Sequence, residues 1–327
     1  MLEGMDTINE SYDVVVVGGG PAGLNGALVL ARSRRSVLVV DAGHPRNAPA
    51  HAVHGLFARE GTPPAELLAR GRDEVTSYGG TVVDGELVGA QRVGEDLEVR
   101  LADGRTTRAR RLLVTSGLVD VLPDVPGLPE RWGRDVLHCP YCHGWEVQDQ
   151  AIGVLAVNHM VVHQALLFRQ LTDDLTVFLH RSTLEPEDAE TLQALGIRLV
   201  DGEVTGLTVE DDRLTGVRLA DGTVVARDAV VVATSMRANA AFLDGIGLRA
   251  VAHPSGVGEH VPADPTGRTE VPGVWVAGNV TDLSASVVVA AAGGMLAGAA
   301  INADLIAADT SQAVAAYRES PASAVAS

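Results

Sequence analysis

The sequence predicts an α/β protein built from two doubly wound nucleotide-binding domains of the Rossmann type, the second inserted into the first. Three observations support this fold class. A glycine-rich turn at residues 18–23 separates an apolar strand pattern from an apolar helix pattern. A second strand–helix–strand pattern begins at Ala151. The chain has 327 residues, 46% of them hydrophobic, which is enough to bury the cores of two domains.

The first βαβ unit lies near the start of the chain. Residues 12–17 form a short apolar run that is typical of a buried strand. After the glycine turn, residues 24–32 have the composition of an apolar helix, and residues 36–41 indicate the next strand. A later strand with a small polar end is expected at residues 112–117.

The second unit repeats this order. A strand is expected at residues 152–156, a helix from about residue 160 to 171, and a strand at residues 175–180. A later strand at residues 229–235 corresponds to residues 112–117 of the first copy. The near-repetition is the reason for predicting two similar domains.

Two segments of alternating polarity interrupt these patterns. An Ala-Asp-Gly turn directly follows residues 82–101, and another lies within residues 203–225. We expect each segment to form a small antiparallel insertion. Residues 1–10 and 310–327 lack strong periodicity and are expected to be loosely held tails.

Loop composition predicts the domain boundaries. Residues 120–129 contain three prolines and form the expected first crossover, while residues 243–254 form the expected return. The first domain is therefore predicted to be discontinuous, with residues 1–120 and 245–327, and residues 121–244 are predicted to form the inserted domain.

Charge and hydropathy exclude some classes of partner. The formal charge is −17, from 25 basic and 42 acidic residues, and it repels a nucleic-acid backbone. The apolar residues 284–300 are rich in Ala and Gly and shorter than a typical membrane span. The N-terminus lacks a basic region followed by an apolar signal core. We therefore expect a cytoplasmic protein with no nucleic-acid partner and no membrane association.

The glycine-rich turn predicts a dinucleotide site. Its residues are Gly18, Gly19, Gly20, Pro21, Ala22 and Gly23. Glycines at Gly18, Gly20 and Gly23 let the backbone approach a pyrophosphate, whose charge is favoured by the N-terminus of the following helix. Asp41, at the end of the next strand, is placed to accept hydrogen bonds from an adenosine ribose.

The only two cysteines, Cys139 and Cys142, are three residues apart. In a cytosolic protein this spacing indicates catalysis or metal binding more often than a structural disulfide. Zinc would require His138 and His143 to complete a strained four-ligand site, so we expect no metal. The segment also matches the attachment pattern of c-type haem, which we set aside because the chain carries no export signal.

Three motifs resemble the thioredoxin reductase family of FAD-dependent disulfide oxidoreductases. They are the Cys-x-x-Cys segment, the strand end Thr115-Ser116-Gly117, and Gly278-Asn279-Val280-Thr281-Asp282 before a helix that starts near Ser286. The resemblance covers nearly the whole chain. The octet Cys-Pro-Tyr-Cys-His-Gly-Trp-Glu from Cys139 is similar to one branch, which contains the dithiol oxidases of gliotoxin- and holomycin-type natural products.

The resemblance implies FAD in the first domain, and the family's motifs indicate which residues are expected to contact it. The implied cofactor-binding residues are Gly18, Gly20, Pro21, Ala22, Gly23, Asp41, Asn47, Thr115, Gly117, Gly278, Asn279 and Val287. Asn279 stands where the family carries an Asp that binds the ribityl chain, and its amide can still donate and accept hydrogen bonds. The alternative is that Asn279 only caps a core helix. Asn47 and His54 lie in a loop that passes the flavin ring in the family, and a homodimer is also implied.

The inserted domain has lost the residues that bind NADPH in the family. Ala156, Asn158 and Val161 stand where Gly-x-Gly-x-x-Ala is expected, and a side chain at Asn158 obstructs the approach of a pyrophosphate. Arg181 is followed by Ser182 where a second arginine is expected. We therefore predict that NADPH binding is weak or absent.

The predicted activity is oxidation of a small-molecule dithiol to its disulfide, with oxygen reoxidising the flavin and hydrogen peroxide as product. By resemblance, Cys142 is the sulfur next to the flavin and Cys139 exchanges with the substrate. His143 is the candidate base, with a structural histidine as the alternative, and His138 is a second choice. Two alternatives remain: a disulfide reductase fed by NADPH or ferredoxin, and a flavin-binding redox sensor without turnover.

Overall fold

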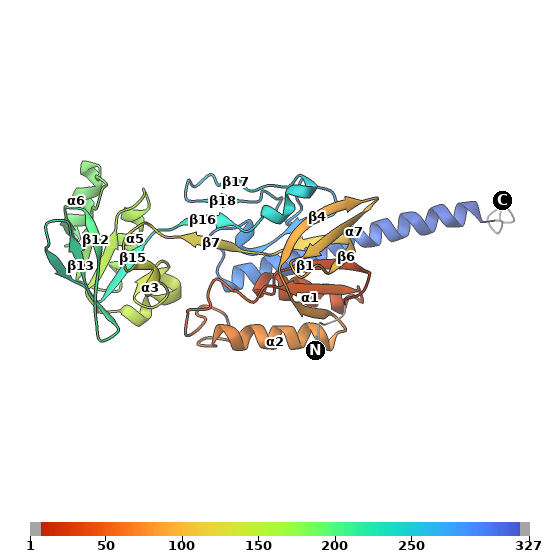
Figure 1. Ribbon diagram of the computed structural model, residues 1–327, viewed down its shortest axis with the longest axis horizontal. Helices are drawn as coiled ribbons and strands as arrows, with labels where there is room; N and C mark the ends of the chain where they lie inside the picture. The colour runs from red at the N-terminus through yellow and green to blue at the C-terminus, as the bar shows by residue number, and fades with distance from the viewer. Residues whose placement is uncertain (1–7, 321–327) are drawn as a thin grey trace. The chain divides into compact units, whose positions relative to one another are not determined.

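The computed structural model describes residues 8–320. Contacts between residues divide the chain into two compact units (Figure 1). Unit 1 contains the chain up to Arg46, residues Ala65–Val119 and the chain from Arg237 onward. Unit 2 contains Asn47–Pro64 and Asp120–Met236. The assignment of a FAD-binding domain to residues 1–120 and 245–327, with an inserted NADPH-domain-like domain at residues 121–244, stays a prediction.

A seven-stranded sheet forms the centre of unit 1. Its strands are β1 Ser11–Val17, β2 Val37–Asp41, β3 Thr81–Asp84, β4 Leu87–Val93, β5 Asp96–Leu101, β6 Thr106–Val114 and β19 Val274–Val276. The order is β3-β2-β1-β6-β5-β4, with β19 also paired to β6. Strands β3, β2, β1, β6 and β19 are parallel, while β4 and β5 pair antiparallel. The carboxyl ends of β1, β2, β6 and β19 therefore meet along one edge.

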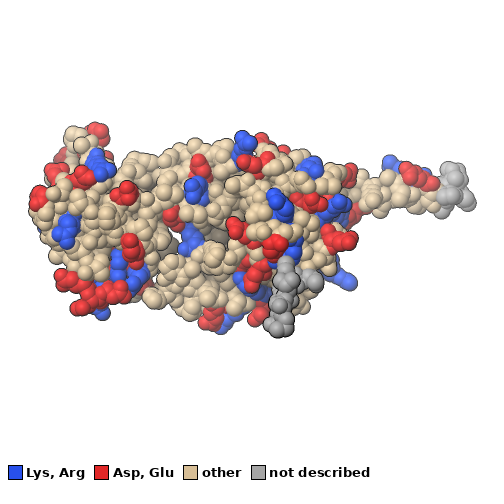
Figure 2. All heavy atoms as spheres, in the orientation of Figure 1, with Lys and Arg blue, Asp and Glu red and all other residues tan. Residues whose placement is uncertain are grey.

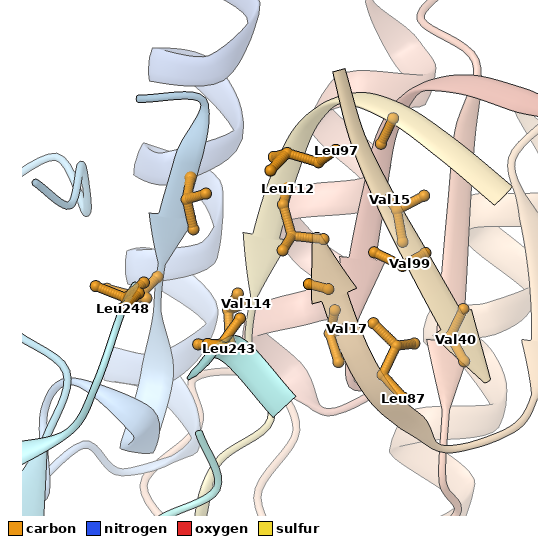
Figure 3. Packing of buried hydrophobic residues seen from close by; sticks show 14 of the residues in the cluster. Val15, Val17, Val40, Leu87, Leu97, Val99, Leu112, Val114, Leu243 and Leu248 are labelled. Carbon is orange, nitrogen blue, oxygen red and sulfur yellow. The ribbon is translucent and has the colours of Figure 1, made fainter. Parts of the chain in front are cut away.

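Burial on both faces explains the near-continuous apolar strands. Val14, Val15, Val16 and the neighbouring β2 residues are almost inaccessible to solvent, as expected for the centre of a parallel sheet. Figure 3 shows one face of this core, in which Val15, Val17 and Leu112 point toward the side chains of β4 and β5. The opposite face packs against the helices.

Two helices cross closely on that face. α1 (Pro21–Arg32) and α7 (Val287–Glu319) meet through small residues. A Cβ added to Gly294 would lie 1.9 Å from the carbonyl oxygen of Ala22, and one added to Gly298 would lie 2.8 Å from that of Gly26. Only glycine allows this separation of the two backbones. A third helix, α2 (Pro64–Ser77), was not predicted.

The C-terminal part of α7 differs from the expected tail. The helix continues to Glu319, so residues 310–319 are helical although exposed. Its last turns extend past the sheet of unit 1 (Figure 1), and Figure 2 shows basic and acidic side chains near their end. An alanine-rich sequence forms a helix without an apolar face, because alanine has the highest helix propensity. The outer parts of both predicted tails, residues 1–7 and 321–327, lie outside the described residues.

Among the described residues, α7 alone is long and apolar enough to cross a membrane, a property that core helices of soluble proteins share. Its buried positions form one stripe at helical spacing. They are Ala290, Gly294, Ala297, Gly298, Ile301 and Leu305. These positions pack into the core of unit 1, which explains the apolar composition of the first half of the helix.

A five-stranded parallel sheet forms the centre of unit 2. Its strands are β8 Val136–Leu137, β9 Ile152–Leu155, β10 Leu175–Phe178, β11 Arg198–Val200 and β15 Ala229–Val232, in the order β11-β10-β9-β15-β8. The helices α5 (Val161–Phe168) and α6 (Pro186–Ala194) pack against strands of this sheet. The strands β12 Val204–Glu210, β13 Arg213–Leu219 and β14 Val224–Ala226 form a separate antiparallel sheet.

The remaining elements are short. They are β7 Leu118–Val121 paired with β16 Ser235–Ala238, β17 Val251–Ala252 paired with β18 Glu259–His260, α3 Leu128–Arg131, α4 Pro140–His143, and the 3₁₀ turns η1 Trp145–Val147, η2 Ala241–Ile246 and η3 Gly278–Val280.

The predicted fold class, with two doubly wound α/β folds, is confirmed. The predicted antiparallel insertions are confirmed at β4–β5 and β12–β14, whereas residues 81–84 join the parallel sheet instead.

Candidate functional site

The loop after β1 forms an open cradle at the N-terminus of α1. Gly20 is the N-cap of α1 and Pro21 follows it, and among the described residues no side chain caps this helix. A Cβ on Gly20 would meet nothing within 4 Å, so the outer side of the loop is accessible to a ligand. The Thr115 hydroxyl, from the end of β6, donates to the carbonyl oxygens of Val17 and Gly18 at 2.8 and 3.0 Å. The loop is therefore fixed from behind and open in front, as an anion-binding helix terminus requires.

Asp41 lies at the end of β2 beside this loop. Its Oδ1 accepts a hydrogen bond from the Gly43 amide at 3.1 Å, and its Oδ2 is paired with the Arg72 guanidinium. A Cβ on Gly19 would lie 2.4 Å from the carboxylate, so the turn and the acid are in direct contact. A cavity of about 460 Å³ opens here. Its lining residues are Asp41, Ala42, Gly43, His44, Arg72, Asp84, Gly85 and Glu86.

The second predicted cofactor motif meets the first one. Gly278 is in the left-handed region (φ 73°), and a Cβ there would lie 3.0 Å from that of Ala22. The Asn25 amide, on α1, donates to the Ala291 carbonyl on α7 at 2.8 Å. Val287 is the first residue of α7. The N-termini of α1 and α7 therefore both lie near the carboxyl edge of the sheet.

Asn279 holds the loop between these motifs. Its amide nitrogen donates to the carbonyl oxygens of Asp282 and Ala285, each at 3.0 Å. The amide therefore braces the loop before α7, which leaves its oxygen as the group to face a ligand. At the end of β6, Gly117 is also left-handed (φ 70°), and its carbonyl accepts from the Asn239 amide at 3.0 Å.

The two cysteines form a disulfide in unit 2. Cys139 is the N-cap of α4 and Cys142 lies within it, with 5.3 Å between their Cα atoms. The amides of Cys142 and His143 both donate to the Cys139 carbonyl, at 3.3 and 3.2 Å. Cys142 is exposed and Cys139 is half-buried. The pair is thus presented at the surface of this unit on one helical turn.

His143 is the last residue of α4 and directly follows Cys142. It follows Cys139 by four residues along a helical turn, a spacing that places side chains on one face. Burial lowers the pKa of His143; the charge of Glu146 opposes this effect, while those of His51 and His54 add to it. The imidazole is therefore neutral at pH 7 and able to accept a proton. His138 instead bonds the Val232 carbonyl through Nδ1 at 3.1 Å.

The loop that contains Asn47 and His54 belongs to unit 2. His54 lies between two carboxylates, with Nδ1 at 2.5 Å from Glu60 Oε1 and Nε2 at 3.3 Å from Glu146 Oε1. Glu146 follows His143 by three residues. The structure therefore brings His54 to the cysteine segment. The Asn47 carbonyl accepts from the Ala50 amide at 3.0 Å within a turn.

Comparison with known proteins settles the family. The model of the pyridine nucleotide-disulphide oxidoreductases matches residues 12–294. The chain belongs to this family.

Individual relatives agree with that placement. Thioredoxin reductase tcpT of Claviceps purpurea is 30% identical over 312 residues, which are 90% of this chain and 94% of tcpT. Thioredoxin reductase sirT of Leptosphaeria maculans is 29% identical over 323 residues, 93% of this chain and 98% of sirT. The crystal structure of HlmI is 44% identical with a TM-score of 0.90, over 96% of this chain and 98% of HlmI. The predicted resemblance to thioredoxin reductases is confirmed, and the protein is an oxidoreductase.

FAD is the cofactor of this flavoprotein family, and unit 1 fits it. The open N-terminus of α1 suits a pyrophosphate, Asp41 beside the cavity suits a ribose, and Asn279 has a side-chain oxygen near the start of α7. When bound, FAD supplies a two-electron acceptor for a thiol pair. Within residues 8–320, no group of three or more His, Cys, Asp or Glu is arranged to hold a metal ion.

The loop after β9, which corresponds to the NADPH-binding loop of the resembled family, is held by hydrogen bonds among its own groups. Asn158 Oδ1 accepts from the Met160 amide at 2.9 Å, directly before α5. The Ser182 hydroxyl donates to the Ala156 carbonyl at 3.1 Å, and Arg181 is paired with Glu203. The Arg181 guanidinium is therefore already paired with a carboxylate of the same unit, that of Glu203. Val161 is the first residue of α5 and is buried.

Sequence reasoning missed three side chains of these sites. Arg72 was missed because α2 was not predicted, although the Pro-Pro pair before it and the glutamate in its first turn are helix-start signals. Glu60 and Glu146 were missed because their common partner, His54, is far from Glu146 in sequence. Only a contact between distant residues identifies them.

Proposed function

We propose that the protein is a FAD-dependent dithiol oxidase that converts a small-molecule dithiol to its disulfide. One observation carries the proposal: the Cys139–Cys142 disulfide occurs together with a loop after β9 in which Asn158 stands in place of a glycine and its side chain accepts from the Met160 amide. A reductase fed by NADPH needs a nicotinamide site, whereas an oxidase takes its electrons from its thiol substrate. The octet that begins at Cys139 resembles the gliotoxin- and holomycin-type oxidases, and the match to HlmI supports this branch.

The thiol chemistry follows from the arrangement of the side chains. His143 accepts a proton from the first substrate thiol, and the resulting thiolate attacks Cys139, releasing the Cys142 thiolate. The second substrate thiolate then attacks the substrate sulfur of the mixed disulfide and releases Cys139. The substrate leaves as a disulfide, having lost two electrons and two protons. The Cys139 and Cys142 sulfurs would then re-form their disulfide by giving the two electrons to bound FAD, which would pass them, with the two protons of the substrate thiols, to oxygen as hydrogen peroxide.

Exposed aromatic side chains near the cysteines support a small apolar substrate. Tyr141 is 79% exposed and Trp145 is 70% exposed, and they are separated by four residues along the cysteine segment. Phe57, at the tip of the His54 loop, is 95% exposed. Aromatic faces at this position would contact the carbon skeleton of a dithiol.

Anaerobic stopped-flow absorbance tests the proposal. The yellow protein is mixed separately with dithiothreitol and with NADPH, and Cys139→Ser and Cys142→Ser serve as controls. We expect the flavin of the wild type to be bleached by the dithiol alone, and neither variant to respond. In air, one hydrogen peroxide should form per dithiol consumed. A wild-type flavin that no dithiol reduces contradicts the oxidase.

A disulfide reductase is the second candidate, favoured by the relatives named thioredoxin reductase. Rapid bleaching of the flavin by NADPH in the same experiment would support it. Reduced ferredoxin is tested in the same way, because a different donor bypasses the loop after β9.

We further propose that the oxidase is a cytoplasmic homodimer that acts in natural-product biosynthesis. The exposed apolar side chains of α7, Ile306, Val314 and Tyr317, support self-association. Light scattering of the full chain and of an Ile306→Glu variant tests the dimer: the wild type should have twice the monomer mass, and the variant should dissociate.

A further inference from the structure

The segment around His54 is a closed loop with its own internal bonds. Val53 and Thr62 pair as an antiparallel bridge, and the Val53 amide donates to the Thr62 carbonyl at 2.8 Å. Inside the loop, Glu60 accepts from the Gly55 amide at 2.9 Å and from His54 Nδ1 at 2.5 Å. These two hydrogen bonds lower the pKa of Glu60, so its carboxylate is charged throughout the neutral range. One side of the His54 ring is therefore held within its own loop.

The other side of the ring reaches the cysteine segment. His54 Nε2 lies 3.3 Å from Glu146 Oε1, on the turn η1 that follows α4. When both ring nitrogens carry protons, His54 bridges the loop carboxylate and the cysteine-segment carboxylate. This contact joins two segments that are distant in sequence and that both belong to unit 2.

His143 is surrounded by charges from both segments. Glu146 acts on it from its own segment, and His51 and His54 act on it from the loop. Glu60 lies beyond His54, and the thiols of Cys139 and Cys142 become titratable when the disulfide is reduced. The negative charge of Glu146 favours a protonated His143, whereas the two loop histidines favour the neutral form.

We infer that His54 is a positioning residue of the dithiol site: its Nε2 holds Glu146, on the turn that follows the cysteines, against the loop and so sets the arrangement of charges around His143. This rests on the proposed function only in giving His143 the role of base. Among the described residues, the hydrogen bonds and ion pairs of His54 join it to Glu60 and Glu146, so its effect passes through Glu146 and through its electrostatic influence on His143.

The inference gives opposite signs for two substitutions. His54→Asn removes the loop histidine that acts to lower the pKa of His143 and also releases Glu146, so the pKa of His143 should rise. Glu146→Gln removes the negative neighbour, so the pKa of His143 should fall. The two midpoints should therefore move in opposite directions from the wild-type midpoint. His54→Gln keeps a neutral donor near the position of Nε2, and its shift should have the sign of His54→Asn and a smaller size.

The titration of His143 is followed directly by NMR on the oxidised FAD-bound protein with isotope-labelled histidine. The signal of His143 is assigned by its loss in a His143→Asn variant. His163→Asn, an exposed histidine on α5, is the matched control and should leave the midpoint unchanged. Circular dichroism confirms folding at each pH. An unchanged midpoint in both His54 variants, or shifts of the same sign in His54→Asn and Glu146→Gln, would overturn the inference.

The pH profile of flavin reduction by dithiothreitol provides the second readout. Its acid limb should move to higher pH in His54→Asn and to lower pH in Glu146→Gln, following the NMR midpoints. A purely structural role would lower the rate at every pH without moving the limb. If no dithiol reduces the wild-type flavin while the NMR midpoints still shift as expected, the proposed function fails and the positioning role of His54 stands.

Discussion

The amide of Asn279 donates a hydrogen bond to the carbonyl oxygen of Ala285, 3.0 Å away, and a second to the carbonyl of Asp282. An aspartate at this position, which is usual in the thioredoxin reductase family, would point a carboxylate at these two acceptors. The family residue is therefore unsuited to this loop.

We expect Asn279→Asp to weaken FAD binding and to lower the free energy of unfolding by about 1–3 kcal/mol, because it replaces donors with a repelled charge. Thermal unfolding and flavin release measure the effect. Asn302→Asp is the control, because Asn302 uses its oxygen to accept from Arg35 at 2.9 Å and an aspartate preserves that role. Equal losses in both variants would contradict the explanation.

The crossing of α1 and α7 predicts opposite effects for two adjacent glycines. Gly294→Ala places a methyl group 1.9 Å from the Ala22 carbonyl oxygen and should cost at least about 2 kcal/mol of unfolding free energy. Gly293→Ala has its nearest neighbour at 3.9 Å and should be neutral or stabilise by up to about 1 kcal/mol through helix propensity. Urea unfolding of the two variants decides the matter. A stable Gly294→Ala protein would mean that the two helices are less closely packed.

Acid should release an ion-pair network in unit 2. The guanidinium groups of Arg134 and Arg131 lower the pKa of Asp212 from 3.8 to about 2. A depressed folded-state pKa stabilises above the unfolded value, so this contribution is complete above about pH 4 and is lost as the pH falls toward 2. Asp212→Asn should therefore be less stable than the wild type at pH 7, and the difference should shrink below pH 4. Asp211→Asn, in the same turn, is the matched control; a constant difference across pH contradicts the linkage.

The exposed indole of Trp145 should determine affinity for apolar dithiols. Trp145→Ala is expected to raise the KM of benzenedimethanethiol about 3- to 10-fold and to leave that of dithiothreitol nearly unchanged, because only the first has an aromatic ring to stack. The kcat should stay the same, since the indole does not take part in sulfur exchange. Tyr78→Ala, an exposed aromatic change in unit 1, serves as control. Parallel losses for both dithiols would assign Trp145 a structural role.

Local patterns predicted much of the fold. The strand at β1, the turn before α1 and the start of α7 follow from short apolar runs, glycine spacing and a small-residue helix, all of which are set by neighbouring residues. β6 was predicted to begin at residue 112 but begins at Thr106, because its polar first half pairs antiparallel with β5. The pairing partner of a polar strand is not encoded in its own periodicity.

The candidate sites were only partly predictable for the same reason. Cys139, Cys142 and His143 are adjacent in sequence, so their proximity follows from one helical turn. The contact of His54 with Glu146 and that of Arg72 with Asp41 join separate elements. Such pairs depend on how the loop and α2 pack. No rule of spacing identifies them.

The four crossings of the chain between its units matter for anyone who exchanges parts between relatives. A graft of residues 120–236 carries Cys139, Cys142 and Glu146 into a new host but leaves Asn47–Pro64 behind, and with it His54 and Glu60. Such a chimera inherits the host's loop opposite its cysteines. The transferable module is two separate stretches of sequence, and a successful exchange of specificity has to move both.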